Sequence, residues 1–129
     1  MSDAKLVYTH TLDIVWGDLD ALGHVNNCRY FEYMQEARIQ WLKTLNLDLA
    51  QSQGPVVVYV DCSFLKPIFY PATLSIHCLL HSAGRSSVVM DYELYQQDIL
   101  MAKGSSKMVW VDYQKNQPRP LPTLVRELC

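Results

Sequence analysis

Apolar and polar residues follow two different periods along this chain of 129 residues. From residue 8 to 16 every second position is apolar or bulky, which predicts a half-buried strand. The residues expected on its buried side are His10, Leu12, Ile14 and Trp16. From about Asn27 the spacing becomes three and four residues, so we expect one long helix with a single apolar stripe. The stripe comprises Tyr30, Met34, Ala37, Trp41 and Leu45.

Strand-like segments make up most of the second half of the chain. They cover residues 56–65, 73–81, 88–95 and 100–113, and turn-forming residues separate the last three of them. A short final helix is expected over residues 123–128. The helix has one stripe to bury and the sheet needs one face covered, so the order predicts an antiparallel sheet of about five strands wrapped around one long helix. The fold class is therefore α+β.

Composition limits the classes of protein to which the chain can belong. At 129 residues we expect a single domain spanning 1–129. The formal net charge is −2 and no cluster of Lys and Arg stands out, which argues against nucleic-acid binding. No apolar run is long enough to span a bilayer, and the first five residues have no secretory core, so we expect a cytoplasmic protein without a membrane partner. The four cysteines lack Cys-x-x-Cys spacing and are expected to be free thiols.

The loop between the first strand and the helix carries the candidate chemistry. Asp18 and Asp20 lie in this polar break, and Asn26 or Asn27 can cap the helix that follows. The backbone N–H groups of Gly23, His24 and Val25 are candidates for binding a carbonyl oxygen or an anion near the positive end of the helix. A carboxylate beside such donors suits acyl-transfer chemistry. Spacing alone favours a structural turn, with two solvated Asp residues and an ordinary helix cap.

The run from Asp20 to Arg38, DALGHVNNCRYFEYMQEAR, resembles the hallmark of hotdog-fold acyl-CoA thioesterases of the 4-hydroxybenzoyl-CoA thioesterase type. The resemblance implies a hotdog fold and hydrolysis of an acyl-CoA to the free acid and coenzyme A. It implies that Asp20 is the catalytic carboxylate, acting as general base or as nucleophile, and that the amides of Gly23, His24 and Val25 polarise the carbonyl. Asn27, together with Asp18, would support the loop.

The same resemblance implies an oligomer, a homodimer or homotetramer with sites at a dimer interface. Tyr59 and Ser63 are then expected to contact substrate across that interface, and the turn residue Arg85 to contact the nucleotide phosphates.

Other kinds of site find less support in the sequence. His77 and His81 stand four apart in a strand, about 13 Å from each other, too far to share one metal ion. We expect no metal and no cofactor. The Gly-x-Ser-x-Gly elbow of serine thioesterases and the Gly-rich phosphate loops are absent. Two alternatives stay open, a hotdog hydratase or dehydratase and a non-catalytic acyl-binding module.

Overall fold

The computed structural model describes residues 3–47 and 52–129. The expectation that the first five residues form no secretory core includes Met1 and Ser2, which lie outside the described residues. The elements in chain order are β1 (Lys5–Asp13), the 3₁₀ helix η1 (Trp16–Asp18), α1 (Asn27–Thr44), β2 (Gln53–Phe64), β3 (Thr73–His81), β4 (Ser87–Gln96), β5 (Ile99–Asp112), β6 (Gln117–Pro118) and α2 (Thr123–Glu127). The α+β prediction is confirmed, and the two-residue β6 is an addition to it.

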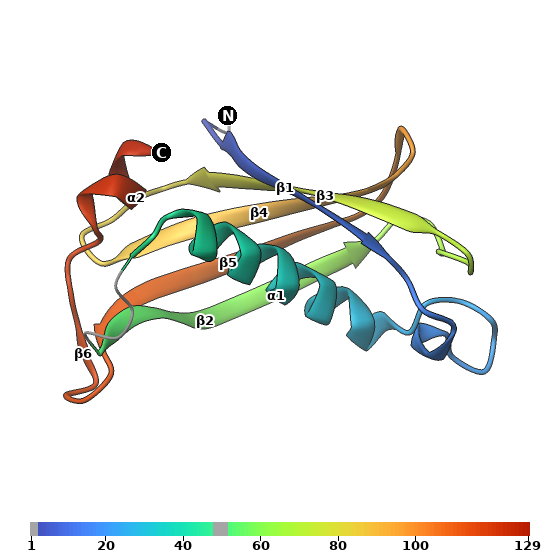
Figure 1. The fold of residues 1–129 in the computed structure, drawn as a ribbon, viewed down its shortest axis with the longest axis horizontal. Helices are drawn as coiled ribbons and strands as arrows, with labels where there is room; N and C mark the ends of the chain where they lie inside the picture. Colours follow the sequence, from blue (N-terminus) through green and yellow to red (C-terminus); the bar gives the residue numbers. More distant parts are fainter. Residues whose placement is uncertain (1–2, 48–51) are drawn as a thin grey trace.

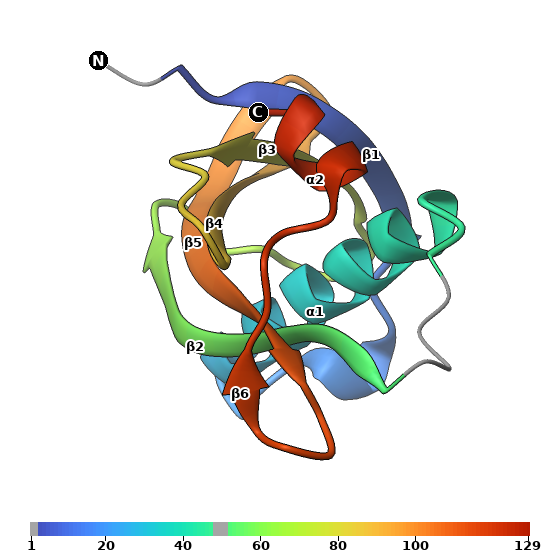
Figure 2. The ribbon, with the colours of Figure 1, turned by 90° about the vertical axis from the view of Figure 1, so that its left-hand side faces the viewer.

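All long strands pair antiparallel in one sheet, in the order β1-β3-β4-β5-β2, with β6 added to β5. The sheet curls, and α1 lies along its concave side (Figures 1 and 2). The β3–β4 and β4–β5 pairs are hairpins between neighbours in the chain, whereas β1 and β2 join the sheet beside β3 and β5. This is the wrapped sheet that the order of periods predicted.

Burial follows the sequence periods closely. Alternate side chains of β3 and β4 face α1 and are fully buried, among them Ile76, Leu80 and Tyr92. On α1 the expected stripe residues Tyr30, Met34, Ala37 and Trp41 are buried, and Leu45 packs against the core. The helix and the concave face of the sheet therefore form one continuous hydrophobic core.

The side chain of Met34 on α1 packs directly over Gly104 of β5. A Cβ at this position would overlap the sulfur of Met34 and would lie 2.9 Å from the backbone oxygen of Asp61. The missing side chain at Gly104 thus lets α1 sit low on the sheet.

The alternating pattern of the first strand ends earlier than its sequence suggests. Ile14 is buried as expected, but the chain turns into η1 immediately afterwards and Trp16 is 74% exposed. The expectation that Trp16 belongs to the buried side of the strand is wrong, because the strand period of two no longer applies in a 3₁₀ turn.

Candidate active site

The loop that precedes α1 is closed by the carboxylate of Asp20. Its Oδ1 accepts hydrogen bonds from the backbone N–H of Leu22 at 2.8 Å and of His24 at 3.3 Å. The N–H of Asp20 also donates to the carbonyl of His24 at 2.7 Å. Gly23 has φ +85°, a left-handed conformation that glycine adopts without strain, and this lets the chain turn back within five residues. The other carboxylate oxygen of Asp20, Oδ2, has no hydrogen-bond partner among the described residues and is available to a ligand.

Asn26 caps the N-terminus of α1. Its side-chain oxygen accepts a hydrogen bond from the N–H of Cys28 at 2.9 Å, which resolves the choice between the two asparagines in favour of Asn26 as the N-cap. Asn27 is the first residue of the helix. The loop-support role expected of Asn27 stays a prediction.

Asp18 lies between the loop and α1 and is mostly buried, with 9% of the residue exposed. Its Oδ2 accepts hydrogen bonds from the Tyr33 hydroxyl at 2.7 Å and from the N–H of Val15 at 3.1 Å, and Arg29 Nε lies 3.6 Å from its Oδ1. Burial and the hydrogen bond to Asp18 raise the pKa of Tyr33. These contacts tie Asp18 to α1 and to the end of β1, and its burial excludes a solvated turn residue at this position.

A recess of about 170 Å³ lies beside this loop and is called the deep recess here. Asp20 and Asn27 line it together with Val25, Tyr30, Phe64 and Lys66. Val25 and Tyr30 are each 2% exposed, so the recess reaches the edge of the hydrophobic core. The ring of Phe64 meets Tyr30 edge-on with centroids 4.8 Å apart. The walls are therefore mainly apolar and aromatic, and Lys66 is the only Lys or Arg among its lining residues.

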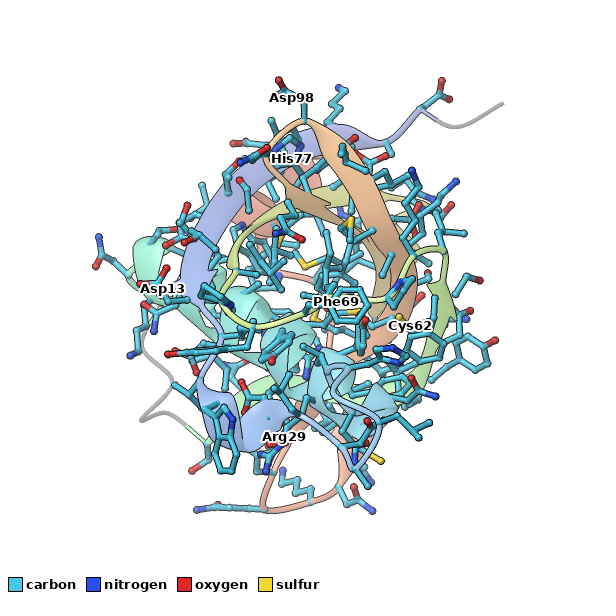
Figure 3. All side chains as sticks on the ribbon, turned by 90° about the vertical axis from the view of Figure 1, so that its right-hand side faces the viewer. Asp13, Arg29, Cys62, Phe69, His77 and Asp98 are labelled. Atoms are coloured by element: carbon cyan, nitrogen blue, oxygen red, sulfur yellow. The ribbon has the colours of Figure 1, made fainter. Side chains whose placement is uncertain are left out.

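The loop 65–72 closes the other side of the same end of the molecule. His24 pairs with Phe69 through a β-bridge and an edge-on ring contact of 4.8 Å, and Val25 N–H donates to the Ile68 carbonyl at 2.9 Å. Figure 3 looks onto this end, with Phe69 near its centre between Arg29 and His77. His24 thus holds the two loops together.

The three backbone amides expected to polarise a carbonyl are already occupied. Gly23 N–H donates to the Asp20 carbonyl at 3.1 Å, His24 N–H to Asp20 Oδ1, and Val25 N–H to the Ile68 carbonyl. The structure therefore gives no support to these three amides as donors to a ligand, because each already has an acceptor within the chain. Among the described residues the N–H of Asn27 has no partner, as expected for the first residue of a helix, and Asn27 lines the deep recess.

Three further candidate residues do not meet Asp20 within the chain. In the β2–β5 register Tyr59 and Ser63 stand opposite the exposed Lys107 and Lys103, on the face of the sheet turned away from α1. The helix-facing positions of this part of β2 are Val60, Cys62 and Phe64, which pair with buried Ser106, Gly104 and Ala102. Ser63 lines a different hollow, on the outer face, together with Asp91 and Lys103.

Arg85 lies in the β3–β4 turn, at the end of the molecule opposite to the Asp20 loop (Figure 1). Its carbonyl accepts hydrogen bonds from Leu121 N–H at 2.9 Å and Arg126 Nη2 at 3.2 Å. The turn therefore anchors the C-terminal segment. A contact between Arg85 and the substrate held by the same chain's Asp20 finds no support in this arrangement.

Potential metal ligands do not gather in the described ranges 3–47 and 52–129. Nowhere there do three His, Cys, Asp or Glu side chains converge as a metal ion requires.

Burial raises the pKa of the Cys62 thiol to about 11, and the nearby Asp61 adds to the shift. No helix of the described part has the length and apolar character needed to cross a membrane.

A single long helix held in a curled antiparallel sheet is the architecture of the hotdog fold. The model of the thioesterase-like superfamily matches residues 14–128, and the chain belongs to that family. A relative from Aquifex aeolicus (strain VF5), provisionally named an esterase, is 30% identical over 94 residues, which are 70% of this chain and 73% of the relative.

Solved structures agree with this assignment. The PA2801 protein of Pseudomonas aeruginosa, provisionally described as a thioesterase, superposes with a TM-score of 0.91 at 36% identity over 95% of this chain and 98% of that one. A gentisyl-coenzyme A thioesterase superposes with a TM-score of 0.84 at 25% identity, over 92% of this chain and 99% of the other. The family and these likenesses identify the chain as a thioester hydrolase.

Proposed function

We propose that the chain hydrolyses an acyl-CoA to the free acid and coenzyme A, with Asp20 as the catalytic carboxylate. The observation that carries the proposal is the geometry of Asp20, whose Oδ1 is fixed by two amides while Oδ2 has no partner among the described residues. A carboxylate held in this way is oriented without losing its second oxygen. The 25% identity to a thioesterase that acts on gentisyl-coenzyme A supports a coenzyme A thioester as substrate.

In this proposal the thioester carbonyl lies at the start of α1. The free N–H of Asn27 donates a hydrogen bond to the carbonyl oxygen, and the positive end of α1 stabilises the negative charge that develops there. Asp20 either removes a proton from the attacking water or attacks the carbonyl carbon itself, and the thiolate of coenzyme A leaves in both routes. In the second route the product is a mixed anhydride on Asp20, which water then hydrolyses to the free acid and the restored carboxylate. The acyl group occupies the deep recess, against Tyr30 and Phe64.

We further propose that the active enzyme is a homodimer joined along β2, which is an edge strand of the sheet. Its exposed apolar residues include Val57, Val58 and Val60, at 36%, 58% and 41% exposure. A long apolar edge of this kind favours pairing with another strand. Because a continued sheet keeps its faces, the partner's helix-facing β2 residues, rather than Tyr59 or Ser63, would lie nearest the site.

Substitution of Asp20 by Asn tests the catalytic assignment. Asparagine keeps an oxygen that can accept the N–H groups of Leu22 and His24, so the loop should stay closed while the negative charge is lost. We expect turnover to fall by at least about a hundredfold, the effect of losing a positioned base or nucleophile. The measurement is release of free thiol, detected with a disulfide-exchange dye, across aliphatic and aryl acyl-CoAs.

The matched control is Asp98→Asn, an exposed carboxylate in the β4–β5 turn, which should hydrolyse at the wild-type rate. Equal turnover for Asp20→Asn and wild type would overturn the role of Asp20. The assay also separates the alternatives, because a hydratase consumes an enoyl-CoA without releasing thiol and a binding module does neither.

A further inference from the structure

Asp20 lies on two recesses at once. It lines the deep recess, and it also lines a second hollow of about 410 Å³, called the loop recess here. The loop recess is formed by Trp16, Gly17, Leu19, Asp20, Ala21 and Gly23. A thioester has two arms that leave its carbonyl carbon in different directions, so two recesses that meet at the catalytic carboxylate can receive one arm each.

Trp16 gives the loop recess its character. It is 74% exposed, although an indole buries more apolar surface than most other side chains when it is covered. A Cβ at Gly17 would find nothing within 4 Å, so the surface beside the indole is open backbone. Among the described residues the N–H groups of Gly17 and Ala21 have no partner. The recess thus combines a flat apolar ring with free amide donors, and Asp20 is its only charged residue.

The two recesses differ in how buried their lining residues are, and this assigns the arms. The deep recess reaches Val25 and Tyr30, each 2% exposed, and suits an acyl group that gains from burial. The loop recess lies on the surface and suits an uncharged chain that carries both amides and methyl groups. The pantetheine arm shared by coenzyme A and acyl carrier proteins has this chemistry.

We infer that Trp16 binds the pantetheine arm of the leaving group, with the indole packed on its methyl groups and the backbone of residues 17–21 facing its amides. This inference rests on the proposed thioesterase function and extends it to a residue that positions the substrate. It concerns the arm alone, so it holds whether the arm belongs to coenzyme A or to a carrier protein.

Kinetics with truncated substrates test the assignment. Wild type and Trp16→Ala are compared on three thioesters of one acyl group, namely the acyl-CoA, the acyl-pantetheine and the S-methyl thioester, which has no arm. We expect Trp16→Ala to raise KM about tenfold for the first two, from lost contact with the methyl groups, and to leave kcat nearly unchanged. The S-methyl thioester should be hydrolysed within twofold of wild type. Trp16→Phe should restore most of the affinity.

The control variant is Ile99→Ala, an exposed apolar residue in the β4–β5 turn region that lines neither recess. It should match wild type on all three substrates. An equal loss for Trp16→Ala on the S-methyl thioester would overturn the inference, as would an effect that grows with acyl size. A loss confined to acyl-CoA would place the nucleotide on the indole instead and would also overturn it.

Fluorescence gives a readout that does not need catalysis. Trp41 and Trp110 are each 1% exposed, so acrylamide quenching of this three-tryptophan protein reports mainly on Trp16. Coenzyme A and pantetheine should protect Trp16 from acrylamide, and the free acid should not. Protection by the acid alone would place the acyl arm on Trp16 and overturn the inference. If wild type hydrolyses no thioester while coenzyme A still protects Trp16, the proposed function fails and the binding surface stands.

Discussion

Asp18 and Asp20 stand two residues apart in the same loop and occupy opposite environments. Asp20 is exposed and is held by amides of its own turn, whereas Asp18, the last residue of η1, is buried and accepts a hydrogen bond from Tyr33 of the helix. One carboxylate is therefore available to a ligand and the other ties the loop to α1. This division of roles depends on a contact across 15 residues, which spacing within the loop cannot reveal.

Replacing Asp18 by Ala should reduce stability. The buried Tyr33 hydroxyl would lose its acceptor, and a buried polar group without a partner costs about 1–3 kcal/mol in addition to the lost bond. We expect the free energy of unfolding to fall by about 2–4 kcal/mol, measured by urea denaturation followed by circular dichroism.

The Tyr33→Phe background provides the control for Asp18. Without the Tyr33 hydroxyl there is no buried donor to leave unpaired, so Asp18→Ala should cost clearly less in that background than in wild type. Equal costs in the two backgrounds would show that the hydrogen bond between these residues is not what anchors the loop.

At the scale of elements, the sequence periods predict most of the fold. The stripe of α1 and the alternation in β3 and β4 match the buried residues, because each period of apolar residues mirrors the geometry of a single element. What the periods miss depends on contacts between elements. The free amide of Asn27 is one example, because the contacts that occupy the amides of residues 23–25 leave no periodic signal in the sequence. Trp16 is another, because a short 3₁₀ turn leaves no periodic signal.

The fit of α1 against the sheet can be tested at Gly104. An Ala at this position would push its Cβ against Met34 and toward the backbone of β2, which cannot yield as a flexible side chain can. We expect Gly104→Ala to lower the free energy of unfolding by about 1–3 kcal/mol in thermal or urea denaturation.

A glycine with free space around it serves as the comparison for Gly104. Gly17→Ala introduces the same methyl group where nothing lies within 4 Å, and its unfolding free energy should stay within about 0.5 kcal/mol of wild type. If both alanine variants were equally stable, α1 would not be packed on β5 as closely as the structure has it.

At the scale of the whole molecule, the site at one end of α1 lies next to the free edge of β2. Phe64, the last residue of β2, lines the deep recess and is 42% exposed, so part of the wall of this recess faces outward. The family resemblance implies that Tyr59 and Ser63 contact the substrate across a dimer interface, but the bulge between Val57 and Tyr59 changes which side chains face the helix. A one-residue shift of this kind reverses the faces of every residue after it.

Dimerisation through β2 is the remaining prediction. Val58→Asp places a charge on the exposed edge, 58% accessible in the single chain, where it should leave the protomer folded but bring two carboxylates together across a twofold axis. Like charges at an interface cost several kcal/mol, so the dimer dissociation constant should rise by about a hundredfold or more.

The control variant is Leu124→Asp, on α2 and 42% exposed, which introduces the same charge away from the edge and should stay dimeric. Light scattering at micromolar concentration measures both masses. A wild-type mass of one chain with full thioesterase activity, or a Val58→Asp variant as dimeric as Leu124→Asp, would show that β2 does not join the subunits.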